Sequence, residues 1–360
     1  MSFERKGVSL TDLLLIIATG ILILILWQLR SLLLSLMIAV VLAAAISPLV
    51  DLAEKLRLPR WLGVIVVYTS IITALIAVGL FIGPSVSEQI QRLVRKLPTY
   101  LDNLRTTSKT LALRMGVTQL ESIERFFDIQ GFINFVLRSS QKLLVRSFGL
   151  TFGIVGSVLN LIFAVVISGY MVAGSKKLVN GLANLCPQPW DRRLAEQVTP
   201  IARRMGGYIQ GRVLVSLILG IVITLGLSIL GLSEFALALG VIAGFTNLIP
   251  FIGPVLGAIP ALIVAIPLGS WTFLWVLLLF VIIQNLETYV LDPLLVGSSV
   301  RVHPLYQLLA VLGGTQLLGI IGALIIPPWV AGIAVLLENL YLKPKLIAQA
   351  EDNFPTLSIK

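Results

Sequence analysis

Apolar runs recur along the chain, and each approaches or exceeds the roughly 20 residues that a helix needs to cross the hydrocarbon core of a bilayer. Six such runs cover residues 13–29, 31–50, 61–83, 148–173, 213–232 and 271–289. Arg30 is the only charged residue between the first two runs, which predicts a tight helical hairpin with this cation at the water interface. A cleaved signal peptide is the alternative for the first run, because Arg5 and Lys6 precede it.

The composition excludes an ordinary soluble enzyme and a disordered chain. Of the 360 residues, 57% are hydrophobic and 12% are charged, whereas soluble proteins carry about 25% charged residues. Cys186 and His303 are the only residues of their kinds, which excludes an internal disulfide and Cys-rich or His-rich metal sites. The sequence contains no phosphate-binding loop and no plausible Ser–His–Asp set. We therefore expect neither an enzyme nor a protein with a bound cofactor or metal.

The basic residues indicate how the chain is oriented. The net charge is +10, and in so apolar a chain we assign it to loops that face an anionic membrane surface, not to nucleic acid. More than half of the Lys and Arg residues lie at the two termini, before the third apolar run and in residues 175–212. The positive-inside rule then predicts a multi-pass protein of the cell membrane, with both termini in the cytoplasm and residues 84–146 outside.

The alternation of apolar and polar stretches divides the chain into six parts. Residues 1–83 hold three transmembrane helices, residues 84–146 an amphipathic helical insertion, and residues 147–174 a fourth transmembrane helix. They are followed by a basic cytoplasmic amphipathic segment, a C-terminal transport unit and a tail, over residues 175–212, 213–342 and 343–360.

The insertion carries two amphipathic patterns. In the first, apolar residues recur every three or four positions from Val86 to Leu97 and predict a helix that Pro98 ends. The second pattern covers residues 126–137. These helices either form a small domain that packs on itself, or lie on the bilayer surface or against a neighbouring subunit.

Two apolar segments of the C-terminal half are too long for one simple helix. Residues 235–268 are broken by the Gly and Pro residues of NLIPFIGPVLGAIP, and residues 305–340 by several glycines and by Pro327-Pro328. Proline removes a backbone donor, and non-helical backbone at membrane depth survives only inside protein or beside a wet cavity. We expect two re-entrant-like hairpins that enter from opposite membrane faces, as in an inverted repeat. The alternative is two kinked single crossings.

The predicted fold is thus an all-α integral membrane protein with about six to eight transmembrane helices. Its candidate substrate or ion pathway consists of Asn247, Pro250, Gly253, Pro254, Gln284, Asn285, Glu287, Asp292, His303, Gly313, Gly314, Thr315 and Gln316. Glu287 or Asp292 is the candidate carrier of a coupling proton or site for Na⁺; the alternative is a helix cap or an ion pair with Arg301. We expect Thr315 and Gln316 at the apex of the second hairpin.

Two further residues have alternative interpretations. His303 precedes Pro304 and is either a proton carrier or a structural residue at a helix start. Arg212 opens the fifth apolar run, where it either attracts an anion or, as such a residue does more often, anchors the helix at the membrane interface.

Several of these motifs resemble the pattern of the autoinducer-2 (AI-2) exporter family of bacterial membrane proteins. The resemblance covers most of the chain and is carried by Tyr208-Ile209-Gln210-Gly211-Arg212, residues 247–261, Asn285, Asp292-Pro293, Gly297, His303-Pro304, Gly313-Gly314, Gly319, Gly322 and Pro327. The linker departs from the pattern at Leu294 and Ser298, where the family usually has basic residues. We expect the lack of these cations to alter anion handling or loop packing.

The resemblance implies a multi-pass secondary transporter that forms a homo-oligomer, with a pentamer as our working guess. Some members are assigned to export of AI-2, and others look like Na⁺(Li⁺)/H⁺ antiporters. The first interpretation is therefore export of a small polar metabolite or signal such as AI-2, by an elevator-like motion of the C-terminal half. The alternatives are a Na⁺(Li⁺)/H⁺ antiporter and a non-transporting membrane scaffold. The partners expected in every case are the lipid bilayer and, for a carrier, its solute.

Overall fold

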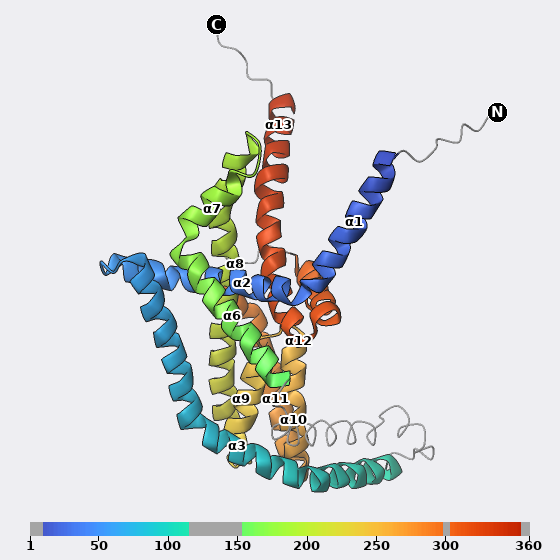
Figure 1. Cartoon of the computed structure of the whole chain (residues 1–360). Coiled ribbons are helices and arrows are strands. Elements are labelled where there is room, and N and C mark those ends of the chain that lie inside the picture. The colour runs from blue at the N-terminus through green and yellow to red at the C-terminus, as the bar shows by residue number, and fades with distance from the viewer. Residues whose placement is uncertain (1–9, 115–152, 298–302, 354–360) are drawn as a thin grey trace, which may run out of the picture.

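The computed structural model describes residues 10–114, 153–297 and 303–353, and these residues form helices joined by short turns, with no strand among them (Figure 1). The long helices are α1 (Leu10–Gln28), α2 (Arg30–Lys55), α3 (Arg60–Arg114), α6 (Gly153–Ala173), α8 (Trp190–Leu227), α11 (Ser270–Leu286) and α12 (Pro304–Leu337). The shorter helices are α7 (Ser175–Ala183), α9 (Ala236–Thr246), α10 (Ile252–Ala265) and α13 (Lys343–Asn353). Turns of altered pitch extend α8, α10, α11 and α12 as η1 (Ser228–Leu232), η2 (Ile266–Leu268), η3 (Glu287–Val296) and η4 (Glu338–Leu342).

The predicted all-α membrane fold is confirmed. Five helices of the described chain are long and apolar enough to cross a bilayer, and α6 with α7 adds a sixth if this pair, bent by 83°, is counted as one span. The five spans are Arg30–Lys55, Arg60–Tyr100, Trp190–Leu232, Ser270–Val296 and Pro304–Ile347. Much apolar surface is left on their outer faces, as expected for side chains that face lipid instead of water.

The junction of α1 and α2 differs from the predicted tight hairpin. The amide of Leu29 donates to the Ile25 carbonyl and that of Leu33 to the Leu29 carbonyl, both at 2.9 Å. Helical hydrogen bonding therefore runs through the junction, because no Gly or Pro interrupts it. The two helices meet at a bend and point in different directions (Figure 1), and the Arg30 guanidinium lies 5.1 Å from the Trp27 ring centre.

The α3 helix also differs from the prediction, because Pro98 does not end it. Pro84 and Pro98 both lie inside this helix, which continues to Arg114 and turns across the lower end of the bundle (Figure 1). Leu93 is buried in the core that the C-terminal helices form, and Lys96 Nζ lies 2.8 Å from Glu234 Oε1. The first amphipathic pattern thus packs on its own chain, while the second, at residues 126–137, lies outside the described residues.

The first broken segment folds into two short antiparallel helices. α9 ends at Thr246, the backbone turns through Asn247–Phe251, and α10 runs back against α9. Phe251 closes the turn with a φ of 66°, in the left-handed region that a bulky residue rarely adopts. α9 packs on α8, and α10 packs on α11, so the pair is held between two long helices (Figure 1).

The second broken segment turns at Gly319, which has φ 65° and ψ −148° within α12. A side chain at Gly314 would meet the carbonyl of Gly322, and one at Gly322 would meet that of Gly314. Residues eight positions apart in a straight helix are separated by about 12 Å, so the chain folds back on itself here. The turn lies beyond Thr315 and Gln316, and the Thr315 hydroxyl donates to the Val311 carbonyl one helical turn earlier. The two residues therefore precede the apex instead of forming it.

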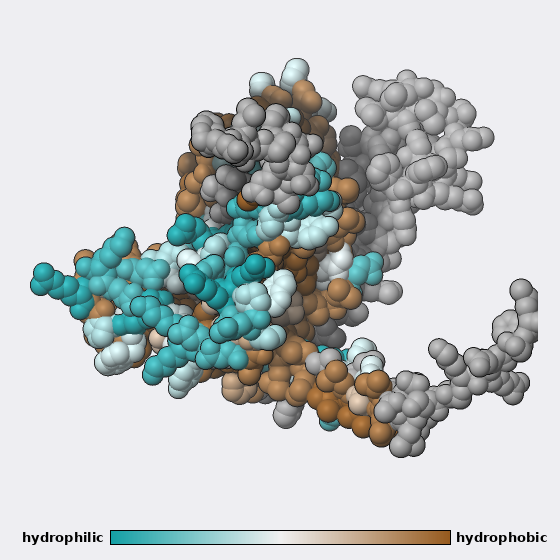
Figure 2. All heavy atoms as spheres, turned by 90° about the horizontal axis from the view of Figure 1, so that it is seen from above, coloured by the Kyte–Doolittle hydropathy of each residue, from teal (hydrophilic) through white to brown (hydrophobic). Residues whose placement is uncertain are grey.

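One end of the molecule is polar. Figure 2, seen from above, shows hydrophilic residues gathered on the face where α7 and α13 lie uppermost in Figure 1, with hydrophobic surface beside them. The exposed basic residues of these elements and of the start of α8 are Lys176, Lys177, Arg192, Arg193, Lys343 and Lys345. This is the face to which the positive-inside rule assigns the cytoplasm.

Candidate functional site

Arg212 and Glu287 form a buried ion pair between two long helices. Arg212 lies within α8, and its Nη1 donates to Glu287 Oε1 across 2.8 Å. Each residue is only 3% exposed. Charged groups removed from water are costly to bury unless they are paired and hydrogen-bonded. Within membrane-spanning segments, paired ionisable residues commonly belong to a substrate or ion pathway.

Asn247 and Asp292 complete a polar cluster of four side chains around this pair. Asn247 Nδ2 donates to Glu287 Oε1 at 3.1 Å, and its Oδ1 accepts from Arg212 Nη2 at 3.5 Å. Asp292 Oδ1 lies 3.4 Å from Arg212 Nη1, and its side chain is 41% exposed. The cluster therefore has a buried side at Asn247 and Glu287 and a side open to its surroundings at Asp292. We call these four residues the polar cluster.

Close backbone packing positions the cluster. Gly211 lies against the carbonyl of Leu295, and any side chain at Gly211 would collide with it. α8 and η3 therefore approach more closely than two helices with side chains in between. The next residue along α8 is Arg212, which this approach places beside Glu287 and Asp292 of η3. Asn247 joins them because it ends α9, where the backbone begins to turn.

A cavity of about 270 Å³ lies next to the cluster. Asn247, Gln284 and Glu287 contribute its polar wall, and the remaining lining residues are apolar or proline, including Pro254 and Phe280. Pockets for small molecules are usually apolar with a few polar groups that orient the ligand, and their volumes run from about 300 to 1,000 Å³. The volume of this cavity is just below that range, which suits a small solute or a hydrated ion.

The other predicted pathway residues lie at varying distances from this centre. Pro250 lies in the turn between α9 and α10, and Gly253 lies in the first turn of α10. Asn285 is exposed, and its amide bonds the Val281 carbonyl. His303 caps α12, where its Nδ1 accepts from the Leu305 amide at 3.3 Å. Gly313, Gly314, Thr315 and Gln316 lie in the first arm of the α12 hairpin, and no bond between them and the polar cluster is found in the described chain.

The structure corrects the interpretation of Arg212 as an interfacial anchor. Its guanidinium is enclosed by protein and contacts three polar side chains, instead of reaching toward lipid headgroups. The expected alternative partner of Glu287, Arg301, lies outside the described residues. Glu287 pairs with Arg212, which precedes it by 75 positions. The position of Arg212 at the start of a long apolar run indicates a candidate functional residue, but the sequence alone does not identify Glu287 as its partner.

Sequence reasoning did not propose Tyr208 or Gln307 as site residues, although Tyr208 belongs to a motif that carries the family resemblance. Tyr208 is fully buried one helical turn before Arg212 in α8, and its hydroxyl accepts from Gln307 Nε2 of α12 at 3.4 Å. The four-residue spacing of Tyr208 and Arg212 places both on one face of α8. This contact links the second broken segment to the helix that carries Arg212. The spacing was visible in the sequence, but Gln307 carried no signal of its own.

The described residues contain no group of three or more His, Cys, Asp or Glu side chains that could hold a metal. The polar cluster contains two carboxylates, those of Glu287 and Asp292, and both are paired with Arg212. The groups that this site offers to a solute or an ion are hydrogen-bonding and charged side chains.

Comparison with known proteins agrees with this architecture. The model of the AI-2E transporter family matches residues 14–342. AI-2 transport protein TqsA of Escherichia coli is 25% identical over 343 residues, which cover 92% of this chain and 94% of TqsA. YueF of Bacillus subtilis, provisionally named a transport protein, is 27% identical over 313 residues, which cover 86% of this chain and 84% of YueF. YrrI of the same organism, also provisionally named, is 35% identical over 168 residues, 47% of each chain.

The family match extends from the first apolar helix through the polar cluster and the second broken segment. It covers far more than half of the chain, and it agrees with a helical bundle whose outer faces are apolar. The chain therefore belongs to the AI-2E family of transporters and is a multi-pass membrane transporter.

Proposed function

We propose that this transporter is a secondary carrier that exports a small polar metabolite or signal such as AI-2. The observation that carries the proposal is the cavity of about 270 Å³ beside the buried Arg212–Glu287 pair. Asn247, Gln284 and Glu287 supply hydrogen-bonding groups for a solute rich in hydroxyls, and the apolar remainder of the lining limits its size. TqsA, which is named for AI-2 transport, supports this choice of solute.

The packing supports an elevator-like motion. One buried cluster joins α8–α11 with Leu93 of α3, and a separate cluster joins α2, α3 and α6 around Val50, Val64 and Val172. A smaller cluster around Val41, Met205 and Ile325 joins α2 to α8 and α12, and the motion would have to separate it. Elements that share a core move together more readily than elements with separate cores. In this proposal the C-terminal helices carry the polar cluster and the cavity past the helices of the N-terminal half.

A Na⁺(Li⁺)/H⁺ antiporter is the second candidate, and Glu287 favours it. This carboxylate is buried and borders the cavity, as expected of a group that exchanges a proton for a cation. In that case Arg212 and Asn247 would hold the carboxylate in place while its second oxygen faces the cavity.

Everted membrane vesicles test both candidates. Export in the cell becomes uptake into such vesicles, so labelled AI-2 should accumulate when the membrane is energised and the chain is present. A pH-sensitive dye in the same vesicles reports proton movement after a pulse of Na⁺ or Li⁺. AI-2 uptake without a cation response supports export, a cation response without uptake supports the antiporter, and neither flux from a folded protein supports the scaffold.

The matched variants are Glu287→Gln and Glu196→Gln. Glu287→Gln removes the buried charge beside the cavity, and loss of flux is expected. Glu196 lies on the exposed face of α8 in a pair with Arg192, so the same substitution there should leave the flux unchanged. Equal flux in the two variants would show that the polar cluster is not the transport site.

A further inference from the structure

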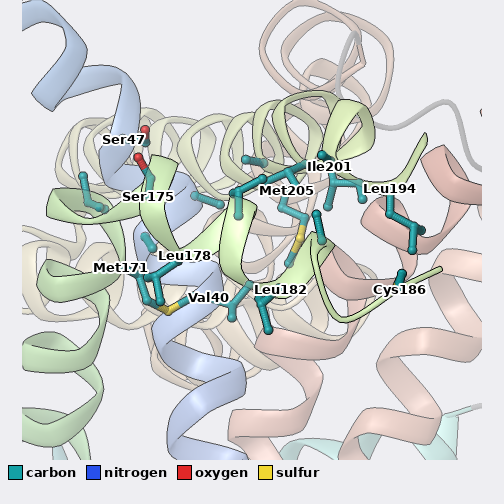
Figure 3. Close-up of a pocket in the computed structure, with 18 residues that line it drawn as sticks. Val40, Ser47, Met171, Ser175, Leu178, Leu182, Cys186, Leu194, Ile201 and Met205 are labelled. Atoms are coloured by element: carbon teal, nitrogen blue, oxygen red, sulfur yellow. The ribbon is translucent and has the colours of Figure 1, made fainter. Parts of the chain in front are cut away.

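A second cavity of about 480 Å³ lies away from the polar cluster, between α2, the end of α6, α7 and the first half of α8. Its lining is almost entirely apolar and includes Val40, Leu182, Ile201 and Met205 (Figure 3). Among the described residues no charged side chain lines it, and the two cavities have no lining residue in common. Apart from the hydroxyls of Ser47 and Ser175, the walls offer a polar solute few hydrogen bonds in exchange for its water, so this cavity suits a mainly apolar ligand.

The helix geometry explains why the space stays open. A side chain at Gly206 would collide with the Ala44 carbonyl, so α8 and α2 are in close contact at this point. α7 then turns by 83° from α6 and reaches over the gap. The gap between α7 and the Gly206–Ala44 contact is wedge-shaped. Side chains of α2 and α8 do not fill this gap, which leaves the cavity.

The two ends of the cavity differ in chemistry. The hydroxyl groups of Ser47 and Ser175 lie side by side at one end, and Cys186 lies toward the other (Figure 3). Lys176 and Lys177 follow Ser175 directly and are exposed. A ligand placed here would have a polar, positively charged neighbourhood at the serine end and an apolar one along the rest of its length.

We propose that this cavity binds one acyl chain of an anionic phospholipid, whose phosphate lies by Ser175, Lys176 and Lys177. The acyl chain gains from leaving water for the apolar wall, and basic residues next to a membrane attract anionic headgroups. α7 has the composition of a helix that lies in the membrane interface, since Leu178 and Leu182 face the cavity while two lysines are exposed. The occupied cavity would fix α7 against α2 and α8.

Cys186 reports occupancy directly, because it is the only cysteine of the chain and lines the cavity. The full-length protein is purified in detergent, and the rate of its reaction with N-ethylmaleimide is measured with added phosphatidylglycerol or phosphatidylcholine. Phosphatidylglycerol should slow the reaction several-fold and phosphatidylcholine much less. No effect of phosphatidylglycerol would overturn the proposal, and equal protection by both lipids would overturn its anionic part.

Other occupants give distinct results in the same assay. Protection in lipid-free detergent that disappears on dilution would show that a second copy of the chain fills the cavity. Protection in lipid-free detergent at every protein concentration would show that another segment of the same chain fills it. Either result would overturn the proposal that a lipid occupies the cavity.

Two pairs of variants locate the site by native mass spectrometry of retained phosphatidylglycerol. Ala183→Phe places a ring in the cavity, whereas Ala173→Phe places it on the exposed surface at the end of α6. Only the first should lose bound lipid. Replacing Lys176 and Lys177 with Gln should also release it, whereas replacing Lys343 and Lys345 of α13 should not. Equal retention within both pairs would overturn the proposal even if the maleimide rates change.

Discussion

Arg212 and Glu287 lie 75 residues apart in the sequence and 2.8 Å apart in the structure, where both are enclosed by protein. Neither side chain has another charged partner of comparable burial in the described chain, since the nearby Asp292 is partly exposed. The stability of each charge therefore depends on the other. Substitutions that remove one charge or both can therefore test this mutual dependence.

Replacing Arg212 with Gln should lower the free energy of unfolding by about 3–5 kcal/mol, because Glu287 is left as a buried charge without a cation. Thermal unfolding of the purified protein in detergent measures the change. Arg192→Gln is the control, since it breaks an exposed pair with Glu196 and exposed pairs contribute little. A similar loss in both variants would contradict the prediction.

The double variant Arg212→Gln with Glu287→Gln should be more stable than Arg212→Gln alone. Removal of the second charge leaves two neutral amides, which need hydrogen bonds but no counter-charge. The same unfolding measurement compares the two proteins. If the double variant is the less stable of the two, the charges are not coupled in the way that the 2.8 Å contact indicates.

Asn247→Leu should abolish transport and lower the free energy of unfolding by about 1–3 kcal/mol, because Glu287 and Arg212 each lose a buried hydrogen-bonding partner. Flux in everted vesicles and thermal unfolding measure the two effects. Asn160→Leu on the exposed face of α6 makes the same chemical change away from the cluster. Transport that survives Asn247→Leu would exclude this amide from the solute path.

Gly314→Ala and Gly313→Ala form a matched pair in neighbouring positions. A side chain at Gly314 would collide with the Gly322 carbonyl, whereas one at Gly313 meets nothing within 4 Å. We expect Gly314→Ala to be destabilised by about 1–3 kcal/mol through overpacking, and Gly313→Ala to be neutral or stabilised by up to about 1 kcal/mol because Ala favours helix. Equal melting temperatures would show that the two arms of α12 do not pack back to back.

The two ends of the first broken segment should face the same side of the membrane. Lys96 of α3 pairs with Glu234 at the start of the segment, and α3 also contacts η2 at its end. Ser233→Cys and Ser270→Cys, each made with Cys186→Ser, should therefore react with an impermeant thiol reagent from one face of sealed vesicles. Lys345→Cys on α13, at the other end of the molecule in Figure 1, should react from the opposite face. Reaction of the two serine positions from opposite faces would make this segment a single kinked crossing.

The architecture was largely predictable because membrane insertion is decided by local composition. A helix in lipid satisfies its backbone hydrogen bonds internally, so a run of about 20 apolar residues is sufficient to predict it. The breaks at Asn247–Phe251 and in α12 were predictable for a related reason, since Gly and Pro weaken a helix wherever they stand. Pro98 was the exception: α3 continues through it because the contacts of Leu93 and Lys96 with the C-terminal helices hold that part of the helix in place.

The sequence by itself thus determined a helical membrane protein, the apolar runs around which its long helices form and the candidate polar residues. Only the tertiary structure decided which of these residues meet. Arg212 joins Glu287 and Asn247 because Gly211 lets α8 approach η3 and because α9 ends at the same level. The turn of α12 falls at Gly319 because the two arms need Gly314 and Gly322 in contact. Such pairings depend on distances between segments that are far apart in the chain, and local composition does not encode those distances.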